Sequence, residues 1–152
     1  MSDSGVKVWT QEDFEEMSWH DNHVHGFSLA EGAHGSRTVS FDIDYILEWI
    51  KQESGAIVFR IAPADLTFHE VTNLVIHLDY EKPTAALSPF SLDSIDRIEE
   101  RRARYTATVW KLNLNWPEGY ISFEASGYVQ TTTGASVVKD QQALREEERR
   151  DA

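Results

Sequence analysis

The sequence contains no cysteine, which excludes disulfide bonds, thiolate metal sites and cysteine nucleophiles. Basic residues are also few, since 14 Lys and Arg oppose 26 Asp and Glu and leave a formal net charge of −12. Phosphate backbones are bound by basic faces, so we expect no nucleic-acid partner. No apolar run approaches the ~20 residues that span a bilayer, and no signal-peptide pattern is visible. We therefore expect no membrane partner and a cytoplasmic location.

The residues that are present describe a folded globule. Hydrophobic residues make up 41% of the 152 positions and aromatic residues 11%, which is enough for a packed core. This length favours one domain. We expect residues 1–138 to form a single β-rich domain and residues 139–152 to form a charged tail, helical or disordered, which frays or remains solvated because it has only Ala143 and Leu144 to bury.

The clearest local pattern is a two-residue alternation from residue 39 onward. Apolar side chains fall on one face of an extended chain and polar ones on the other, namely Val39, Phe41, Ile43, Tyr45, Leu47 and Trp49 against Ser40, Asp42, Asp44 and Glu48. This pattern predicts a long half-buried strand. A helix over residues 45–52 is the alternative, because Ile46, Leu47 and Ile50 also have helical spacing.

Shorter alternating runs predict further strands around residues 57–61, 66–68, 74–80, 109–116, 120–125 and 128–133. Trp116-Pro117-Glu118-Gly119 joins two of them and predicts a hairpin, with Pro117 second in a type I turn and Gly119 in a left-handed position. Residues 10–17 predict a short helix capped by Thr10 and Asp13. Residues 91–104 fit either a helix or a short strand followed by a charged loop.

These elements together predict a mainly β (α+β) fold. We expect an antiparallel β-sandwich or flattened barrel of about 7–10 strands, with a short N-terminal helix and a C-terminal helical tail.

One polar cluster stands out, in the segment Trp19-His20-Asp21-Asn22-His23-Val24-His25. On a strand, His23 and His25 point to the same face, so one cation could bridge them, with His20 and Asp21 closing around it. The structural alternative is a turn anchored by Trp19, in which Asp21 or Asn22 accepts backbone N–H groups and His20 donates to a carbonyl. We commit to no metal or other cofactor here.

Asp42 and Asp44 form a second candidate, because both lie on the polar face of the long predicted strand. Paired carboxylates can perform acid–base chemistry or bind cations, whereas the structural alternative is a solvated face. Arg60 could pair with one of them across strands. We take His20, Asp21, His23, His25, Asp42 and Asp44 as candidate binding residues, and no complete catalytic set is visible.

The order of three elements resembles a group of small uncharacterised bacterial proteins. These elements are Trp19-His20-Asp21-x-x-Val24, then Val39-x-Phe41-x-Ile43, then Leu66-x-Phe68-x-x-Val71-x-x-Leu74. Such proteins open with a W/F-H-D-x-x-hydrophobic motif, and some are grouped with the immunity proteins of polymorphic toxin systems. The resemblance covers about residues 19–129 and implies a compact β-rich domain without a known catalytic site.

Two functions from different classes follow. The first is a non-catalytic binding or immunity-type protein with a basic protein partner, which the −12 charge favours. The second is a metal-dependent enzyme or small-ligand-binding protein that uses the cluster at His20–His25. An exposed edge strand could also pair two copies of the chain.

Overall fold

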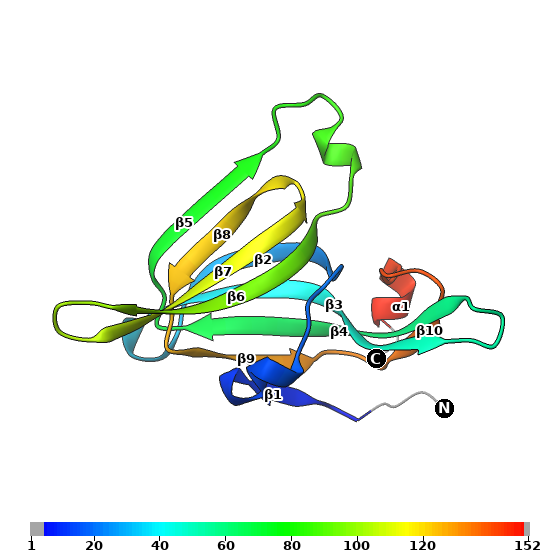
Figure 1. The fold of residues 1–152 in the computed structure, drawn as a ribbon, viewed down its shortest axis with the longest axis horizontal. Coiled ribbons are helices and arrows are strands. Elements are labelled where there is room, and N and C mark those ends of the chain that lie inside the picture. Colours follow the sequence, from blue (N-terminus) through cyan, green and yellow to red (C-terminus); the bar gives the residue numbers. More distant parts are fainter. Residues whose placement is uncertain (1–4, 151–152) are drawn as a thin grey trace.

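The computed structural model describes residues 5–150 and contains one antiparallel sheet of ten strands (Figure 1). The strand order is β1-β9-β4-β3-β2-β6-β7-β8-β5, and β10 pairs with β4 beside this path. The expected mainly β fold is confirmed, and the three 3-10 helices and one α-helix found within residues 5–150 are short.

The elements follow one another with short connections. The N-terminal half contains β1 (Val8–Thr10), η1 (Gln11–Glu16), β2 (His23–Glu31), η2 (Ala33–Gly35), β3 (Arg37–Lys51), β4 (Ile57–His69) and β5 (Thr72–Asp79). The C-terminal half contains η3 (Ala85–Leu87), β6 (Ser91–Arg101), β7 (Thr106–Trp116), β8 (Glu118–Glu124), β9 (Gly127–Thr132), β10 (Val137–Lys139) and α1 (Glu146–Arg150).

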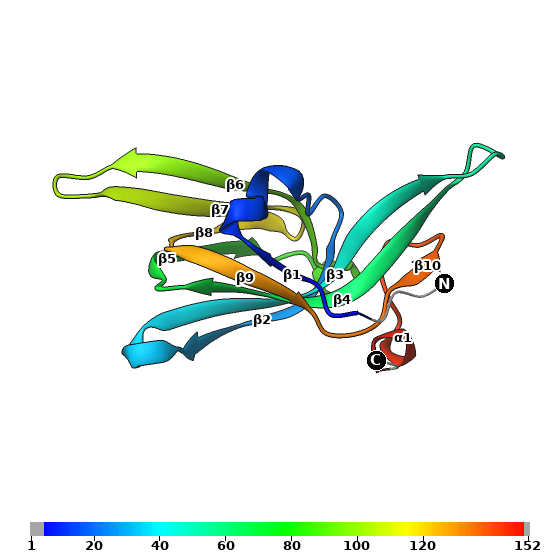
Figure 2. The same ribbon diagram turned by 90° about the horizontal axis from the view of Figure 1, so that it is seen from below.

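The sheet folds over on itself into two layers, which Figure 2 shows from the side. One layer holds β9, β4, β3 and β2, and the other holds β6, β7, β8 and β5. The layers are joined along the sheet where His23 of β2 pairs with Ser91 of β6, and this is the one paired position between those strands. A fold at this narrow junction lets the apolar faces of both layers meet, which is the sandwich expected from the sequence.

Aromatic rings from both layers fill the space between them. Phe68 of β4 lies 4.7 Å from Phe123 and 5.3 Å from Trp110 of the opposite layer, measured between ring centroids. It also contacts Phe41 and Tyr128 of its own layer. All five side chains are buried, and each contributes about 1.5–3 kcal/mol by leaving water.

The long predicted strand is β3, which is extended over its whole length and excludes the helical alternative for residues 45–52. Val39, Phe41, Ile43 and Tyr45 are buried in the core as the alternation predicts. The pairing of β3 with β4 then shifts between Ile46 and Glu48, which inserts one residue. Trp49 consequently pairs with Phe59 on the outer face, so its expected place on the core face is wrong.

A second, smaller core lies on the outer face of β3 and β4. Ile46, Phe59 and Ile61 of the sheet pack there against Leu144, which is 5% exposed, and against Val137. Both covering residues come from the C-terminal segment, defined as residues 137–150 and containing β10 and α1, which Figure 1 shows beside β3 and β4. The expectation of a frayed or solvated tail is therefore wrong for residues 139–150, because Leu144 gains an apolar contact there that solvent cannot give. The expected helix is present as α1, and residues 151–152 of the tail lie outside the described residues.

Of the remaining local predictions, some are confirmed and one is wrong. Thr10 and Asp13 form a reciprocal capping box on η1, as predicted, and the ambiguous segment 91–104 begins with the strand β6. The β7–β8 hairpin is also present, but the Trp116–Pro117 peptide bond is cis and only Pro117 separates the strands, so the type I turn is wrong. Gly119 has φ +142, and a Cβ there would meet the His77 carbonyl oxygen at 1.8 Å.

No helix within residues 5–150 is long and apolar enough to cross a membrane.

Candidate functional site

The polar cluster lies on the segment that leads from η1 into β2. Trp19 is 3% exposed, and its indole N–H donates to the Gln130 side-chain oxygen at 2.8 Å. The backbone N–H of Asp21 donates to the Leu92 carbonyl, and the N–H of Leu92 donates to the Asn22 carbonyl. Trp19 therefore anchors the segment as predicted, and the backbone bonds fix it against the start of β6.

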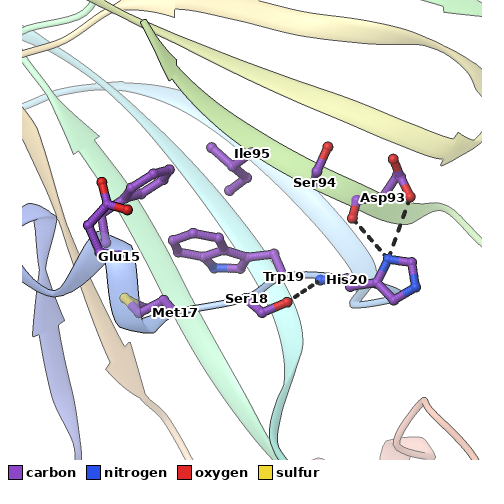
Figure 3. A pocket seen from close by; sticks show the side chains of 9 residues that line it. Glu15, Met17, Ser18, Trp19, His20, Asp93, Ser94 and Ile95 are labelled. Atoms are coloured by element: carbon purple, nitrogen blue, oxygen red, sulfur yellow. Dashed lines mark hydrogen bonds and ion pairs between the residues drawn. The ribbon is translucent and has the colours of Figure 1, made fainter.

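His20 lies at the surface between two carboxylates. Its Nδ1 is 3.2 Å from the Asp93 carbonyl and 3.5 Å from the Asp93 carboxylate, as Figure 3 shows, and its Nε2 is 3.4 Å from the Asp21 carboxylate. The imidazole also stacks on Trp49 at 6.1 Å between centroids. His20 thus makes the predicted carbonyl contact, and its contacts are with Asp93, Asp21 and Trp49 rather than with the His23–His25 pair.

A shallow pocket of about 220 Å³ opens next to His20 (Figure 3). Phe14, Met17, Trp19 and Ile95 provide its apolar walls, and the carboxylates of Glu15 and Asp93 lie on it from η1 and β6. The pocket therefore combines an apolar surface with negative charge at its edge.

Asp21 and Asn22 take roles that differ from the expected turn. The Asp21 carboxylate accepts the side-chain amides of Asn115 at 2.9 Å and Gln142 at 3.1 Å, whereas the expected turn would have it accept backbone N–H groups. Asn22 is fully buried, and neither its side-chain oxygen nor its side-chain nitrogen has a partner within the described chain. Asp21 thus ties the segment to β7 and to the C-terminal segment.

His25 and Asp44 form a close pair on the outer face of the sheet. The His25 Nε2 lies 2.7 Å from the Asp44 carboxylate, which has no exposed surface. The same carboxylate oxygen accepts the backbone N–H of Leu144 at 2.8 Å, and the other oxygen accepts the Arg149 Nε at 2.8 Å. The expected solvated face is wrong for Asp44, because the C-terminal segment covers it and supplies two donors.

Arg149 links this pair to Asp42. Its two terminal nitrogens donate to the two carboxylate oxygens of Asp42, one of them at 3.1 Å, and one also donates to the Ile43 carbonyl at 3.2 Å. The planar guanidinium suits such a forked contact better than a point charge would. The predicted partner of Asp42 or Asp44 was Arg60, which instead pairs with Glu48 at 3.1 Å.

The protonation of the pair follows from these contacts. Burial by itself would raise the pKa of Asp44, but the hydrogen bonds from His25 and from the Leu144 N–H, with the charge of His25, hold that pKa below its ordinary value. Burial and then the nearby charge of His25 lower the pKa of His23 from 6.5. Asp44 is thus an ionised acceptor at neutral pH, and His23 is neutral.

The metal hypothesis is not favoured by this geometry. The rings of His23 and His25 lie 4.5 Å apart between centroids, but within residues 5–150 no three His, Asp or Glu side chains form a group that could hold a metal ion. The guanidinium of Arg149 occupies the cation's place between Asp42 and Asp44. The six candidate residues divide into two groups, His20 with Asp21 and the other four around Arg149.

The sequence patterns do not indicate the residues that complete these two groups. Gln142, Leu144 and Arg149 come from the segment expected to be solvated, and Asp93 and Trp49 approach His20 from β6 and β3. Leu144 was the available signal, because a single large apolar residue in a charged tail can mark a docking point.

Comparisons of the chain with models of protein families, with curated proteins and with solved structures gave no match.

Proposed function

We propose that this chain is a non-catalytic, immunity-type binding protein of the cytoplasm that recognises a basic protein partner through an acidic rim. The acidic rim comprises Glu12, Glu15 and Glu16 of η1 and Asp93 of β6. The lack of cysteine fits a reducing compartment, and the resemblance around Trp19-His20-Asp21 supports the immunity type.

The exposure of these carboxylates is the observation that carries the proposal. The side chain of Glu15 is 82% exposed and that of Asp93 is 51% exposed, and Glu12 and Glu16 are also exposed. Arg97 is largely used in holding η1 to β6, since it donates to the Gln11 carbonyl and to Glu15 and lies over the Phe14 ring. The rim therefore presents negative charge from two elements that are fixed relative to each other.

A rim of this kind has two physical consequences for association. Like-signed carboxylates at one surface attract a basic partner over a distance and raise the association rate, and salt weakens that attraction. The pocket behind the rim then offers the partly exposed Phe14 and Met17 to the aliphatic stem of a lysine or arginine whose charged end meets Glu15 or Asp93.

Charge reversal tests this proposal. A double variant, Glu12→Lys with Glu16→Lys, is compared with a control, Glu81→Lys with Glu118→Lys, which makes the same charge change at exposed positions near the end of β5 and the start of β8. Each protein is immobilised, exposed to native-cell lysate at low and high salt, and its retained proteins are identified by mass spectrometry.

We expect the wild type and the control to retain the same basic protein at low salt and to release it at high salt, and we expect the rim variant not to retain it. The proposal is wrong if no basic protein is retained at low salt. It is also wrong if the two double variants retain the partner equally.

A further inference from the structure

A second polar site lies at the opposite end of the sandwich, where β4 turns into β5. Its centre is Glu124 of β8, which is only 6% exposed. One carboxylate oxygen accepts the Tyr105 hydroxyl at 3.0 Å, and the other accepts the Asn73 side-chain amide and lies 3.4 Å from the Arg102 guanidinium. No sequence pattern singles out these residues, because they come from three separate stretches of the chain: β5, the β6–β7 connection and β8.

The backbone between the end of β4 and the start of β5 is held in an uncommon conformation beside this carboxylate. Glu70 has φ +56 and Asn73 has φ +51, both in the left-handed region that non-glycine residues rarely adopt. Asn73 points its amide at Glu124, and Glu70 accepts the Ser126 hydroxyl at 3.1 Å. Such conformations persist where the surroundings hold them, and they concentrate at binding sites.

A cavity of about 310 Å³ opens at this place. Hydroxyl groups dominate its lining, which includes Thr72, Thr106, Thr108, Ser126 and Tyr105 together with the carboxylates of Glu70 and Glu124. Tyr105 is 58% exposed. The volume is at the lower end of the ~300–1,000 Å³ found for small-molecule sites, which limits the ligand to a small one.

The hydrogen-bonding capacity of the cavity is only partly used. A carboxylate offers about four acceptor positions, and the Glu124 oxygen that accepts Tyr105 has one to spare. Within residues 5–150 the exposed side-chain hydroxyls of Thr72 and Thr106 make no hydrogen bond to another residue. The amide of Asn73 holds the pKa of Glu124 below its ordinary value, so this carboxylate remains an acceptor at neutral pH.

The charges around the cavity nearly balance. Glu70 and Glu124 line it, Arg102 contacts Glu124, and the exposed Arg101 and Arg104 lie at the same β6–β7 hairpin tip as Glu99 and Glu100. The site consequently gives no strong preference to an ionic ligand, in contrast to the acidic rim.

We propose that this cavity binds a small neutral ligand rich in hydroxyl groups, of the class of a single sugar residue or a polyol. Ligand hydroxyls donate to Glu124 and Glu70 and exchange hydrogen bonds with Thr72 and Thr106. The exposed ring of Tyr105 packs against the C–H groups of the ligand, as aromatic side chains with one polar end do at wet sites. This proposal is independent of the acidic rim, which lies on other elements.

An NMR titration tests the proposal. D-glucose, D-galactose, D-mannose and glycerol are each added to the ¹⁵N-labelled full-length protein, and the amide signals are followed. We expect saturable shifts for at least one of these compounds, concentrated at Thr72, Thr106 and Ser126. D-glucosamine serves as the charged probe, and binding of glucosamine without binding of any neutral compound would overturn the proposal.

Two variants separate recognition from folding. Tyr105→Leu removes the ring and its hydroxyl at an exposed position, and Thr106→Val removes one hydroxyl at nearly constant shape. We expect Tyr105→Leu to weaken binding about tenfold, because the ligand loses its packing against the aromatic ring, and Thr106→Val to weaken it less. The control Tyr80→Leu changes an exposed tyrosine beyond the opposite end of β5 and should leave affinity unchanged. Absent shifts, or shifts that both Tyr105→Leu and Thr106→Val leave intact, would refute the site.

Discussion

Asp44 is a carboxylate without exposed surface, and three hydrogen bonds make its burial tolerable. His25, the Leu144 N–H and Arg149 each donate to it. Removing water from a charge is costly unless donors replace the water. The cluster therefore acts first as a tie between the sheet and the C-terminal segment.

Asp44→Asn should lower the free energy of unfolding by about 3 kcal/mol, because it leaves Arg149 and His25 without their buried partner. Urea denaturation measures this loss. Asp96→Asn, at an exposed position with one amide contact, should change stability by less than about 0.5 kcal/mol. Equal losses in the two variants would contradict the buried tie.

The same pair predicts a pH dependence. The folded-state pKa of Asp44 lies below its unfolded value, so the stability that ionised Asp44 contributes is present above about pH 4 and is lost as pH falls through the folded-state pKa. The stability gap between wild type and Asp44→Asn should therefore narrow below about pH 4. A gap that stays constant down to acid unfolding would count against the ionised form.

His23 becomes positively charged when it is protonated, whereas Asp44 loses its negative charge. Protonation of either residue nevertheless lowers the stability of the fold as pH falls. Burial and the charge of His25 hold the pKa of His23 below 6.5, so the folded state binds this proton less tightly than the unfolded state. Stability should decline as pH falls from about 6.5 through the folded-state pKa. An NMR titration of the His23 ring should give a midpoint below 6.5, and a midpoint at or above 6.5 would contradict the burial argument.

At the scale of elements, the C-terminal segment is held by side chains and not by its own helix. α1 has only five residues, far below the ~12–15 at which an isolated helix becomes marginally stable. Leu144 enters the smaller core, Arg149 reaches Asp42 and Asp44, and Lys139 binds Glu148 at 2.6 Å. These contacts explain why so polar a segment lies against the sheet.

Leu144→Ala should lower the free energy of unfolding by about 2–3 kcal/mol, because it leaves a cavity against Ile46 and Ile61. Hydrogen exchange of residues 142–149 should quicken at the same time, since the segment loses its apolar anchor. Leu87→Ala is the matched control, because Leu87 is 82% exposed, and it should change stability by less than about 0.5 kcal/mol. A similar small change in both variants would show that the segment does not depend on Leu144.

At the scale of the whole molecule, the two layers share one aromatic core although few backbone bonds join them. Phe68, Phe123 and Trp110 meet across the layers, whereas β2 and β6 pair only at His23 and Ser91. Cooperativity must therefore come mainly from side-chain packing.

We expect a single unfolding transition, in which tryptophan fluorescence and far-UV circular dichroism change at the same urea concentration. Phe68→Ala should shift both curves together and lower the free energy of unfolding by about 3–5 kcal/mol. Two separated transitions would show that the β5–β8 layer folds independently of the β2–β4 layer.

Local patterns predicted much of the fold. The alternation from Val39 to Tyr45 places β3 correctly, and Thr10 with Asp13 caps η1 as expected. The alternation fails at Trp49, where the inserted residue of the bulge moves the side chain to the other face. Because Ile46 and Ile50 place apolar residues on both faces at the end of this run, a bulge there leaves little trace in the alternation.

The candidate site was predicted in part. His25 and Asp44 do meet, at 2.7 Å, but His20 lies elsewhere, and the partners Arg149, Leu144 and Gln142 were not expected. Arg149 is 105 positions away from Asp44 in sequence. No periodicity connects such residues, because their contact depends on how the whole chain folds back.

The sequence by itself determined the fold class, the net charge of −12, the absence of cysteine and the histidine and carboxylate groups available for polar chemistry. These properties can be read without a structure, because composition and period-two patterns depend only on neighbouring residues. Tertiary structure alone decided that Arg149 takes the cation's place beside Asp44 and that Glu124, Asn73 and Tyr105 meet at a cavity. These contacts join segments distant in sequence, and only the folding of one sheet into two layers brings them together.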